Sequence, residues 1–124
     1  MRKATVNLRE EALAKLEPIP LTDQQYQSVI SEESLTTAIE FWSFRCEACR
    51  KMAPVVSQIA ATFHDKLKVY KVDVDENPRV VSEYAVPLVP YLLILKEGRP
   101  IISFAEEWSL DQISRLPDLR ETAK

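Results

Sequence analysis

The only two cysteines of the chain, Cys46 and Cys49, lie three residues apart where a strand pattern gives way to a helical one. The preceding run, residues 38–42, is apolar except for Glu40 and predicts a buried strand. Thiols at this spacing on a first helical turn lie on the same side of the helix, close enough to form a disulfide. The unpaired N–H groups and the dipole of a helix N-terminus favour the reactive thiolate. The placement of the pair therefore predicts thiol–disulfide chemistry.

Other roles for the cysteine pair stay open at this point. A structural zinc site needs four ligands, and besides the two cysteines the chain offers only His64, so we expect no metal site within one chain. A purely structural disulfide across so short a loop would remove little entropy from the unfolded chain. Inert buried thiols are the third alternative.

Length, composition and net charge indicate one domain and argue against several classes of protein. The 124 residues are 46% hydrophobic, which is enough for one core and predicts a single domain. The net charge is -3 and the basic residues are scattered, so we expect no nucleic-acid partner. No apolar stretch is long enough to span a membrane, and residues 1–17 lack the features of a signal or transit peptide. We therefore expect a cytoplasmic protein without a membrane partner, in a compartment where a Cys-x-x-Cys pair is usually catalytic.

The first third of the chain predicts an arm, a short helix and a strand. Leu8, Ala12, Leu13 and Leu16 share one helical face, and two prolines, Pro18 and Pro20, end that segment. Leu21 is expected to end a short strand. Thr22-Asp23 offers an N-cap for a helix over residues 24–30, and residues 37–43 predict the buried strand.

Strand and helix patterns then alternate to the end of the chain. A long amphipathic helix starts at Cys46 and contains Pro54, which should kink it. A strand over residues 67–74 and a helix from Asn77-Pro78 to about Tyr84 follow. The strands 91–95 and 101–104 flank a hairpin turn with Gly98, the only glycine, at its bend, and residues 110–116 predict a last helix. This order predicts the α/β class.

Several of these motifs, in this order, resemble the thioredoxin family over about residues 21–113. The matching segments are Leu21-Thr22-Asp23, the strand and turn from Glu40 to Cys49, Pro54, Val72-Asp73-Val74-Asp75-Glu76-Asn77-Pro78, Val89-Pro90-Tyr91-Leu92 and Lys96-Glu97-Gly98. The resemblance implies a thioredoxin fold, with a central mixed β-sheet flanked by helices. It divides the chain into an N-terminal arm (1–20), a thioredoxin-like domain (21–116) and a C-terminal tail (117–124).

The resemblance also implies the catalytic residues. Cys46 would be the attacking thiolate and Cys49 the resolving thiol. Glu40 would be the buried base that deprotonates Cys49, and Lys71 would be the lysine that pairs with this acid. A simple buried ion pair of Glu40 with Lys71 remains an alternative.

The substrate-binding residues are likewise implied by the matching positions. Val89 and Pro90, joined by a cis peptide bond in the family, would pair with an extended substrate peptide beside the thiols. The other positions implied around this groove are Trp42, Arg45, Glu47, Ala48, Ala105 and Glu106. Trp42 is equally well explained by core packing.

Four departures from the typical family pattern fall on this surface. Arg45 and the Glu47-Ala48 pair differ from Trp-Cys-Gly-Pro-Cys, Glu40 replaces the usual aspartate, Pro87-Leu88 replaces polar and glycine residues, and Glu106-Glu107 replaces a glycine-containing segment. We therefore expect altered partner recognition, with Glu47, Glu106 and Glu107 favouring basic or polar partners. Solvated surface charge is the alternative.

The function expected from residues and resemblance together is reduction of protein disulfides through a Cys46/Cys49 cycle, by a monomer with no bound cofactor. A thioredoxin reductase or another reductant would supply electrons. Two other functions stay open: a thioredoxin-fold binding module with little turnover, and a metal or iron–sulfur cluster shared by two chains through the cysteine pair.

Overall fold

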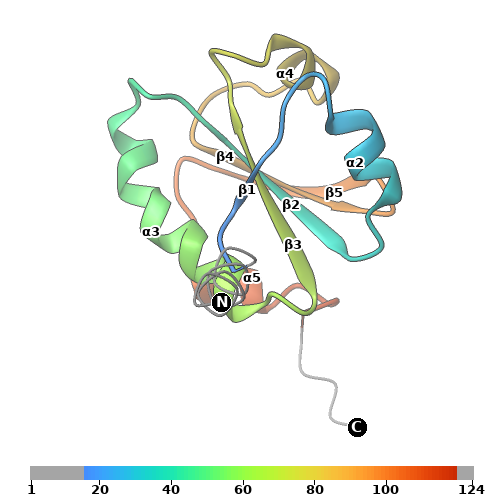
Figure 1. Ribbon diagram of the computed structural model, residues 1–124. Coiled ribbons are helices and arrows are strands. Elements are labelled where there is room, and N and C mark those ends of the chain that lie inside the picture. The colour runs from blue at the N-terminus through green and yellow to red at the C-terminus, as the bar shows by residue number, and fades with distance from the viewer. Residues whose placement is uncertain (1–15, 120–124) are drawn as a thin grey trace, which may run out of the picture.

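A mixed sheet of five strands runs through the centre of the molecule, in the order β1-β3-β2-β4-β5 (Figure 1). The computed structural model describes residues 16–119. The strands are β1 (Ile19–Pro20), β2 (Thr36–Trp42), β3 (Leu67–Asp73), β4 (Tyr91–Lys96) and β5 (Arg99–Ala105). β3 pairs in parallel with β1 and β2, whereas β4 is antiparallel to both β2 and β5. The predicted central mixed sheet is confirmed.

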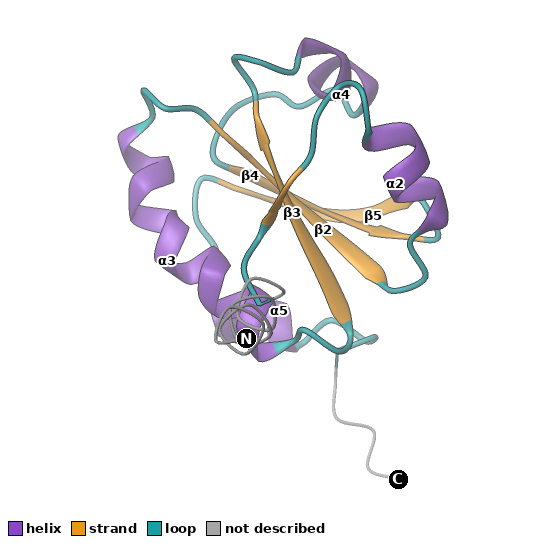
Figure 2. Cartoon of the chain, in the orientation of Figure 1, coloured by secondary structure: helices purple, strands orange, loops and turns teal. Residues whose placement is uncertain are grey.

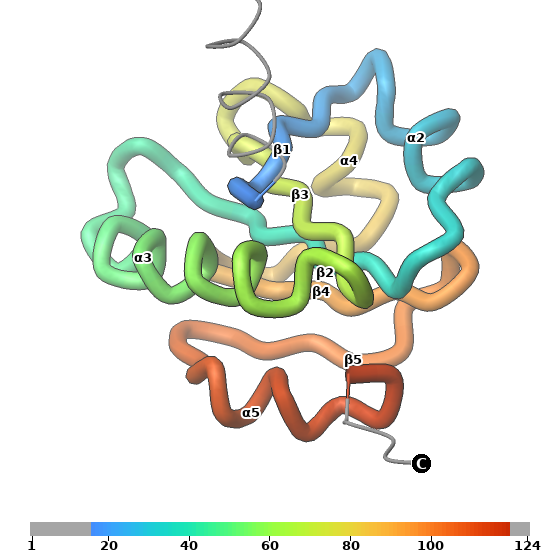
Figure 3. Tube along the Cα trace, turned by 60° about the horizontal axis from the view of Figure 1, so that its bottom comes forward, coloured from blue at the N-terminus to red at the C-terminus, as the bar shows by residue number. Residues whose placement is uncertain are grey.

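Helices cover both faces of this sheet (Figure 2). They are α2 (Tyr26–Glu32), α3 (Glu47–Thr62), α4 (Pro78–Glu83) and α5 (Leu110–Ser114). One core cluster joins α3 and α5 to the sheet through Val56, Ile59 and Ile113. A second cluster joins α2 and α4 to the opposite face through Tyr26, Ile30 and Val80. The sheet therefore lies between two pairs of helices, and the α/β prediction is confirmed. Figure 3 shows α5 on one side of the strands and α2 and α4 on the other.

β2 is the central strand and leads directly to the cysteine pair. Six of its seven residues are buried, as expected for a strand covered on both faces. The strands on either side of β2 determine which residues lie near the cysteine pair. Glu40 lies opposite Lys71 on β3, and Phe41 lies opposite Tyr91 on β4. The carboxyl end of β2 therefore lies beside the start of β4.

The first helix starts later than the sequence predicts, and Asp23 has a different role. α2 begins at Tyr26, its N-cap is Gln25, and no side chain caps it. The Asp23 carboxylate instead accepts hydrogen bonds from the backbone N–H groups of Arg79 (3.1 Å) and Val80 (2.9 Å), at the start of α4. In turn, the Asp23 N–H donates to the Asn77 side chain at 2.9 Å. Asp23 therefore caps α4 rather than its own helix.

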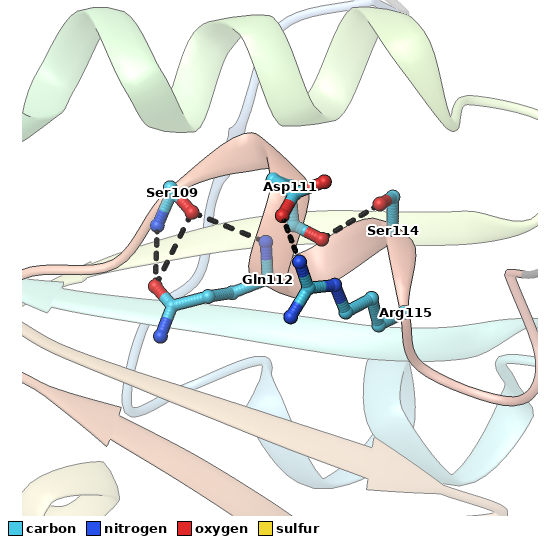
Figure 4. A network of polar contacts seen from close by, with 5 residues as sticks. All are labelled: Ser109, Asp111, Gln112, Ser114 and Arg115. Carbon is cyan, nitrogen blue, oxygen red and sulfur yellow. Dashed lines mark hydrogen bonds and ion pairs between the residues drawn. The ribbon is translucent and has the colours of Figure 1, made fainter.

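Local turn chemistry sets the last elements. The two residues between β4 and β5, Glu97 and Gly98, have φ of 53° and 80°, as in the tight turns that suit hairpins. At α5, Ser109 accepts from the Gln112 N–H and its own N–H donates to the Gln112 side chain, which forms a capping box (Figure 4). Arg115 pairs with Asp111 one turn earlier (Figure 4). These contacts explain why a helix of five residues is well defined.

The structure describes only residues 16–20 of the predicted arm and residues 117–119 of the predicted tail. Leu8, Ala12 and Leu13, on the expected helical face of the arm, lie outside the described residues. Ile19 and Pro20, which belong to the predicted arm, pair with Tyr70 and Lys71 of β3. At the other end, Leu119 packs into the cluster beneath α3 and α5. The division into arm, domain and tail stays a prediction.

Candidate active site

Cys46 and Cys49 form a disulfide at the start of α3, with their Cα atoms 5.2 Å apart. Cys46 is the N-cap residue, and its Sγ accepts a hydrogen bond from the Cys49 N–H at 3.1 Å. Cys49 is 3% exposed, whereas Cys46 is partly exposed. The helix N-terminus thus provides a donor that stabilises negative charge on the outer sulfur. This asymmetry suits Cys46 for attack and Cys49 for resolution.

The turn between β2 and α3 is held by side-chain hydrogen bonds on both flanks. The buried Ser43 hydroxyl donates to the Asp75 carboxylate at 2.7 Å and accepts from the Arg45 N–H at 3.3 Å. On the other flank, the Arg50 guanidinium donates to the Phe44 carbonyl at 2.9 Å. These contacts fix the backbone that leads into Cys46.

Glu40 carries a buried carboxyl group on β2, beside Lys71 on the adjacent strand β3. Its side chain is 5% exposed, and burial raises the pKa of Glu40 to about 7, while the nearby Lys71 ammonium partly opposes the rise. Among the described residues no ion pair within 4.0 Å joins the two groups. A carboxyl group with a pKa near 7 can both accept and release a proton at neutral pH, which is what a general base for a thiol needs.

A cavity of about 450 Å³ connects Glu40 with the inner cysteine. Its walls come from the segment before β1, the end of β2, one face of α3 and β3. The lining residues are Glu17, Pro18, Glu40, Trp42, Ser43, Phe44, Cys49, Arg50, Ala53, Ser57 and Lys71. The structure thus brings together three of the predicted catalytic residues, Cys49, Glu40 and Lys71, in a space large enough for water.

The predicted groove residues lie at the same end of the sheet. The Val89–Pro90 peptide bond is cis, as the resemblance implied. The Pro90 carbonyl accepts from the Glu106 N–H at 2.9 Å, and Ala105 pairs with Tyr91. Arg45, Glu47 and Ala48 are exposed around Cys46. Trp42 is half-buried, and its indole N–H has no hydrogen-bond partner in the described part of the chain.

Sequence reasoning missed several residues around the pair. Phe44 is 78% exposed immediately before Arg45 and Cys46, and its position before the cysteine motif was the available signal. Asp75 contacts Ser43 from a segment more than thirty residues away, and Arg50 on α3 reaches back to the Phe44 carbonyl in the turn before the helix. Spacing alone does not reveal either contact. Ala53 and Ser57, small residues one turn apart on α3, leave room for the cavity.

Residues 16–119 contain no group of three or more His, Cys, Asp or Glu side chains arranged to hold a metal ion. None of the helices within the same range has the length and apolar character needed to cross a membrane.

Comparison with known proteins agrees with this geometry. The family profile described as Thioredoxin matches residues 17–117. Thioredoxin 1 of Synechococcus elongatus is 40% identical over 81 residues, which cover 65% of this chain and 76% of the relative. The thioredoxin of Staphylococcus aureus strain Mu50 is 35% identical over 83 residues, which cover 67% of this chain and 78% of the relative. A solved mutant thioredoxin from Halobacterium salinarum NRC-1 superposes with a TM-score of 0.71 at 26% identity, over 79% of this chain and 85% of that one.

The fold, the cysteine pair at the start of α3 and the profile match point to one conclusion. The thioredoxin fold expected from the sequence is confirmed by the solved neighbour. A binding module without turnover is not favoured, because the related proteins share the disulfide chemistry that this pair is placed to perform. The chain belongs to the thioredoxin family and is a protein-disulfide oxidoreductase.

Proposed function

We propose that the chain reduces protein disulfides, with Cys46 attacking and Cys49 resolving. The observation that supports this assignment best is the hydrogen bond from the Cys49 N–H to the Cys46 sulfur, because the same donor would stabilise a thiolate at Cys46. Among the hydrogen bonds of the described residues, none goes to the Cys49 sulfur. In the reduced chain, the Cys46 thiolate attacks one sulfur of the substrate disulfide and expels the other as a thiolate. A mixed disulfide between Cys46 and the substrate results.

Cys49 then completes the cycle with Glu40 as its base. The Cys49 thiol gives its proton to the Glu40 carboxylate, through water in the cavity that both residues line. The Cys49 thiolate attacks the Cys46 sulfur, the second substrate thiolate leaves, and the Cys46–Cys49 disulfide forms. Lys71 limits how far burial raises the pKa of Glu40, which keeps part of the carboxyl ionised at neutral pH.

The substrate groove is proposed at Val89, Pro90, Ala105 and Glu106, with Trp42, Arg45, Glu47 and Ala48 beside the pair. Support comes from the hydrogen bond between Glu106 and Pro90 and from the exposure of the residues around Cys46. The backbone N–H and C=O groups of an extended substrate peptide could form strand-like hydrogen bonds with the backbone of Val89. We propose further that a monomer acts in the cytoplasm without a bound organic cofactor, and that a thioredoxin reductase or another reductant restores the dithiol.

Insulin reduction driven by dithiothreitol tests the cysteine assignment. The wild-type chain should reduce insulin, and both Cys46→Ser and Cys49→Ser should be inactive. The two variants differ in what they trap, because only Cys49→Ser keeps the attacking thiolate and should accumulate a mixed disulfide with the substrate, measurable by mass spectrometry. If the mixed disulfide accumulated on Cys46→Ser instead, Cys49 would be the attacking cysteine and Cys46 the resolving one. No turnover by the wild-type chain would support a binding module.

Glu40→Gln tests the base, with Glu76→Gln, an exposed residue outside the cysteine pair and the groove, as the matched control. The buried variant should slow release of the second substrate thiolate by about 10²-fold at neutral pH, whereas the control should match wild type. Repeating turnover with NADPH and a thioredoxin reductase identifies the donor, since activity with dithiothreitol alone indicates another reductant.

The acidic residues near the groove suggest a preference for basic substrates. Glu47, Glu106 and Glu107 are all exposed. A disulfide peptide with lysines beside its cystine should be reduced faster than one with glutamates, and added salt should reduce the difference. Glu106→Gln with Glu107→Gln should also reduce it. Equal rates for the two peptides that do not respond to salt would mean that these carboxylates are solvated surface charges with no effect on substrate preference.

A further inference from the structure

Phe44 and Leu88 are large apolar residues that the fold leaves exposed. In the part of the chain that the structure describes, the exposed large hydrophobic residues are Phe44 (78%), Leu88 (39%), Ile101 (53%) and Ile102 (42%). The two isoleucines lie on the edge strand β5. Phe44 and Leu88 instead lie outside the helices and strands, in the loops next to β2 and β4.

These two loops leave the sheet at the same end. β2 ends two residues before Phe44, and β4 begins three residues after Leu88. The strands are antiparallel neighbours, so the end of β2 lies beside the start of β4. The first loop leads to Cys46, and the second contains the cis Val89–Pro90 peptide bond. Phe44 and Leu88 therefore lie at the end of the sheet where a substrate disulfide must meet Cys46.

The backbone around Phe44 is held in place, although the residue itself is mostly exposed. The Phe44 carbonyl accepts a hydrogen bond from the Arg50 guanidinium at 2.9 Å, and the Ser43 hydroxyl accepts one from the Arg45 N–H at 3.3 Å. An aromatic side chain has only two side-chain torsions, so on a fixed backbone it binds a partner with little loss of conformational entropy. Phe44 thus has the properties of a preorganised anchor residue in an interface.

A substrate bonded to Cys46 comes within reach of the Phe44 ring. The Cα atoms of two disulfide-bonded cysteines lie about 5.5 Å apart. Two steps along the chain place the Cα atom of Phe44 within about 7 Å of the Cα atom of Cys46. The reaction therefore determines what covers the ring, because the nearest part of any bound substrate is the segment that carries its disulfide.

Both apolar positions coincide with departures from the typical family pattern. A tryptophan directly precedes the first cysteine in that pattern, whereas this chain has Arg45 there and its exposed aromatic residue one position earlier. Leu88 belongs to the pair that replaces polar and glycine residues before Val89. The apolar contacts available to a substrate are therefore particular to this chain.

We propose that Phe44 and Leu88 select protein disulfides that are flanked by a large apolar side chain. This inference rests on the attack by Cys46 proposed above, and it names the class of substrate. When the mixed disulfide forms, the phenyl ring and the leucine side chain remove apolar surface of the substrate from water. Polar flanking residues gain nothing from these contacts. Phe44 and Leu88 thus determine specificity, whereas the cysteines perform the thiol chemistry.

Two disulfide peptides of equal charge test the preference. They share one cystine and the same lysines, and they differ only in having leucines or serines beside the cystine. The reduced chain is mixed with each peptide, and the thiols released in a single turnover are counted after quenching. The wild-type chain should reduce the leucine peptide about tenfold faster than the serine peptide. Phe44→Ala and Leu88→Ala should each lower this ratio to about threefold or less.

Ile101→Ala is the matched control. Ile101 is also an exposed apolar residue, but it lies on β5, outside the proposed site, so its replacement should leave the ratio unchanged. Each ratio compares two substrates on the same variant, so any loss of folded protein cancels. Equal wild-type rates for the two peptides, or a ratio that neither Phe44→Ala nor Leu88→Ala lowers, would overturn the proposal.

Two further measurements separate recognition from turnover and from self-association. In Cys49→Ser, which should retain the mixed disulfide on Cys46, a mixture of the two peptides should trap mainly the leucine peptide, and adding Phe44→Ala should reduce that excess. Sedimentation of the wild-type chain should show a monomer. A dimer that Phe44→Ala dissociates would assign the ring to an interface between two copies and overturn the proposal. A wild-type chain that reduces neither peptide would contradict the redox cycle and this inference with it, whereas an active chain without a peptide preference would contradict this inference alone.

Discussion

Glu40 lies opposite Lys71 in the parallel register of β2 and β3, yet only the carboxyl of the pair is buried. Glu40 is 5% exposed and its pKa is raised from 4.5 to about 7, mainly by burial. The folded chain therefore holds a proton that the unfolded chain releases above about pH 4.5. The consequence is that ionised Glu40 destabilises the fold that positions it.

Because ionised Glu40 destabilises the fold, the free energy of unfolding should decrease as the pH rises and Glu40 ionises. The contribution of protonated Glu40 is fully present below about pH 4.5 and is lost as the pH rises to about 7. This loss amounts to about 3 kcal/mol. Glu40→Gln should remove that decline, so its free energy of unfolding in urea should exceed that of wild type most at about pH 8. Glu76→Gln, on the exposed surface outside the helices, is the control. A constant difference between Glu40→Gln and wild type across this range would contradict the assignment.

Asp23→Ala should destabilise the protein through α4 rather than α2. The Asp23 carboxylate accepts from two backbone N–H groups at the α4 N-terminus, and their loss should cost about 1–2 kcal/mol. Asp23→Asn keeps an acceptor and should lose less. Urea unfolding measures both, with Asp65→Ala in an exposed turn as the control. Hydrogen exchange should place the added opening in residues 78–83, and exchange confined to α2 would argue against the long-range cap.

Ser43→Ala should loosen the turn before Cys46. The Ser43 hydroxyl joins the Asp75 carboxylate to the Arg45 N–H, and its removal should cost about 1 kcal/mol or somewhat more because one partner is charged. Ser103→Ala, on the exposed edge strand β5, should have little effect. Urea unfolding measures the stability, and insulin reduction shows whether the turn must be rigid. A Ser43→Ala chain as stable as wild type would show that this contact adds nothing in solution.

Glu97→Asn should stabilise the β4–β5 hairpin. Glu97 has φ of 53°, a conformation that asparagine adopts more readily than glutamate, and Gly98 already supplies the second left-handed residue. A gain of about 0.5 kcal/mol is expected in thermal or urea unfolding. Glu97→Gln removes the charge but keeps the length of the side chain, so it separates conformation from electrostatics. Equal stabilisation by both variants would attribute the gain to charge.

The sequence predicted those features that local patterns determine. The buried run before Cys46 indicated β2, Asn77-Pro78 indicated the start of α4, and Gly98 marked the hairpin. The prediction for Asp23 was wrong because its partners, Arg79 and Val80, lie more than fifty residues away. The cavity escaped prediction for a similar reason. It requires Glu17, just before β1, to contact Ser57 on α3, and these residues are 40 positions apart in the sequence, a distance over which no spacing pattern predicts a contact.

The position of β2 between β3 and β4 has a consequence for how the molecule opens. An inner strand with partners on both sides and helices over both faces is among the last segments to exchange its amide hydrogens, whereas β1 and β5 have one partner each. The cysteines follow this strand directly, so local fraying of either sheet edge leaves them in place. A protein that breaks and remakes one of its own covalent bonds in every cycle thus holds the two ends of that bond beside a strand that we expect to open late.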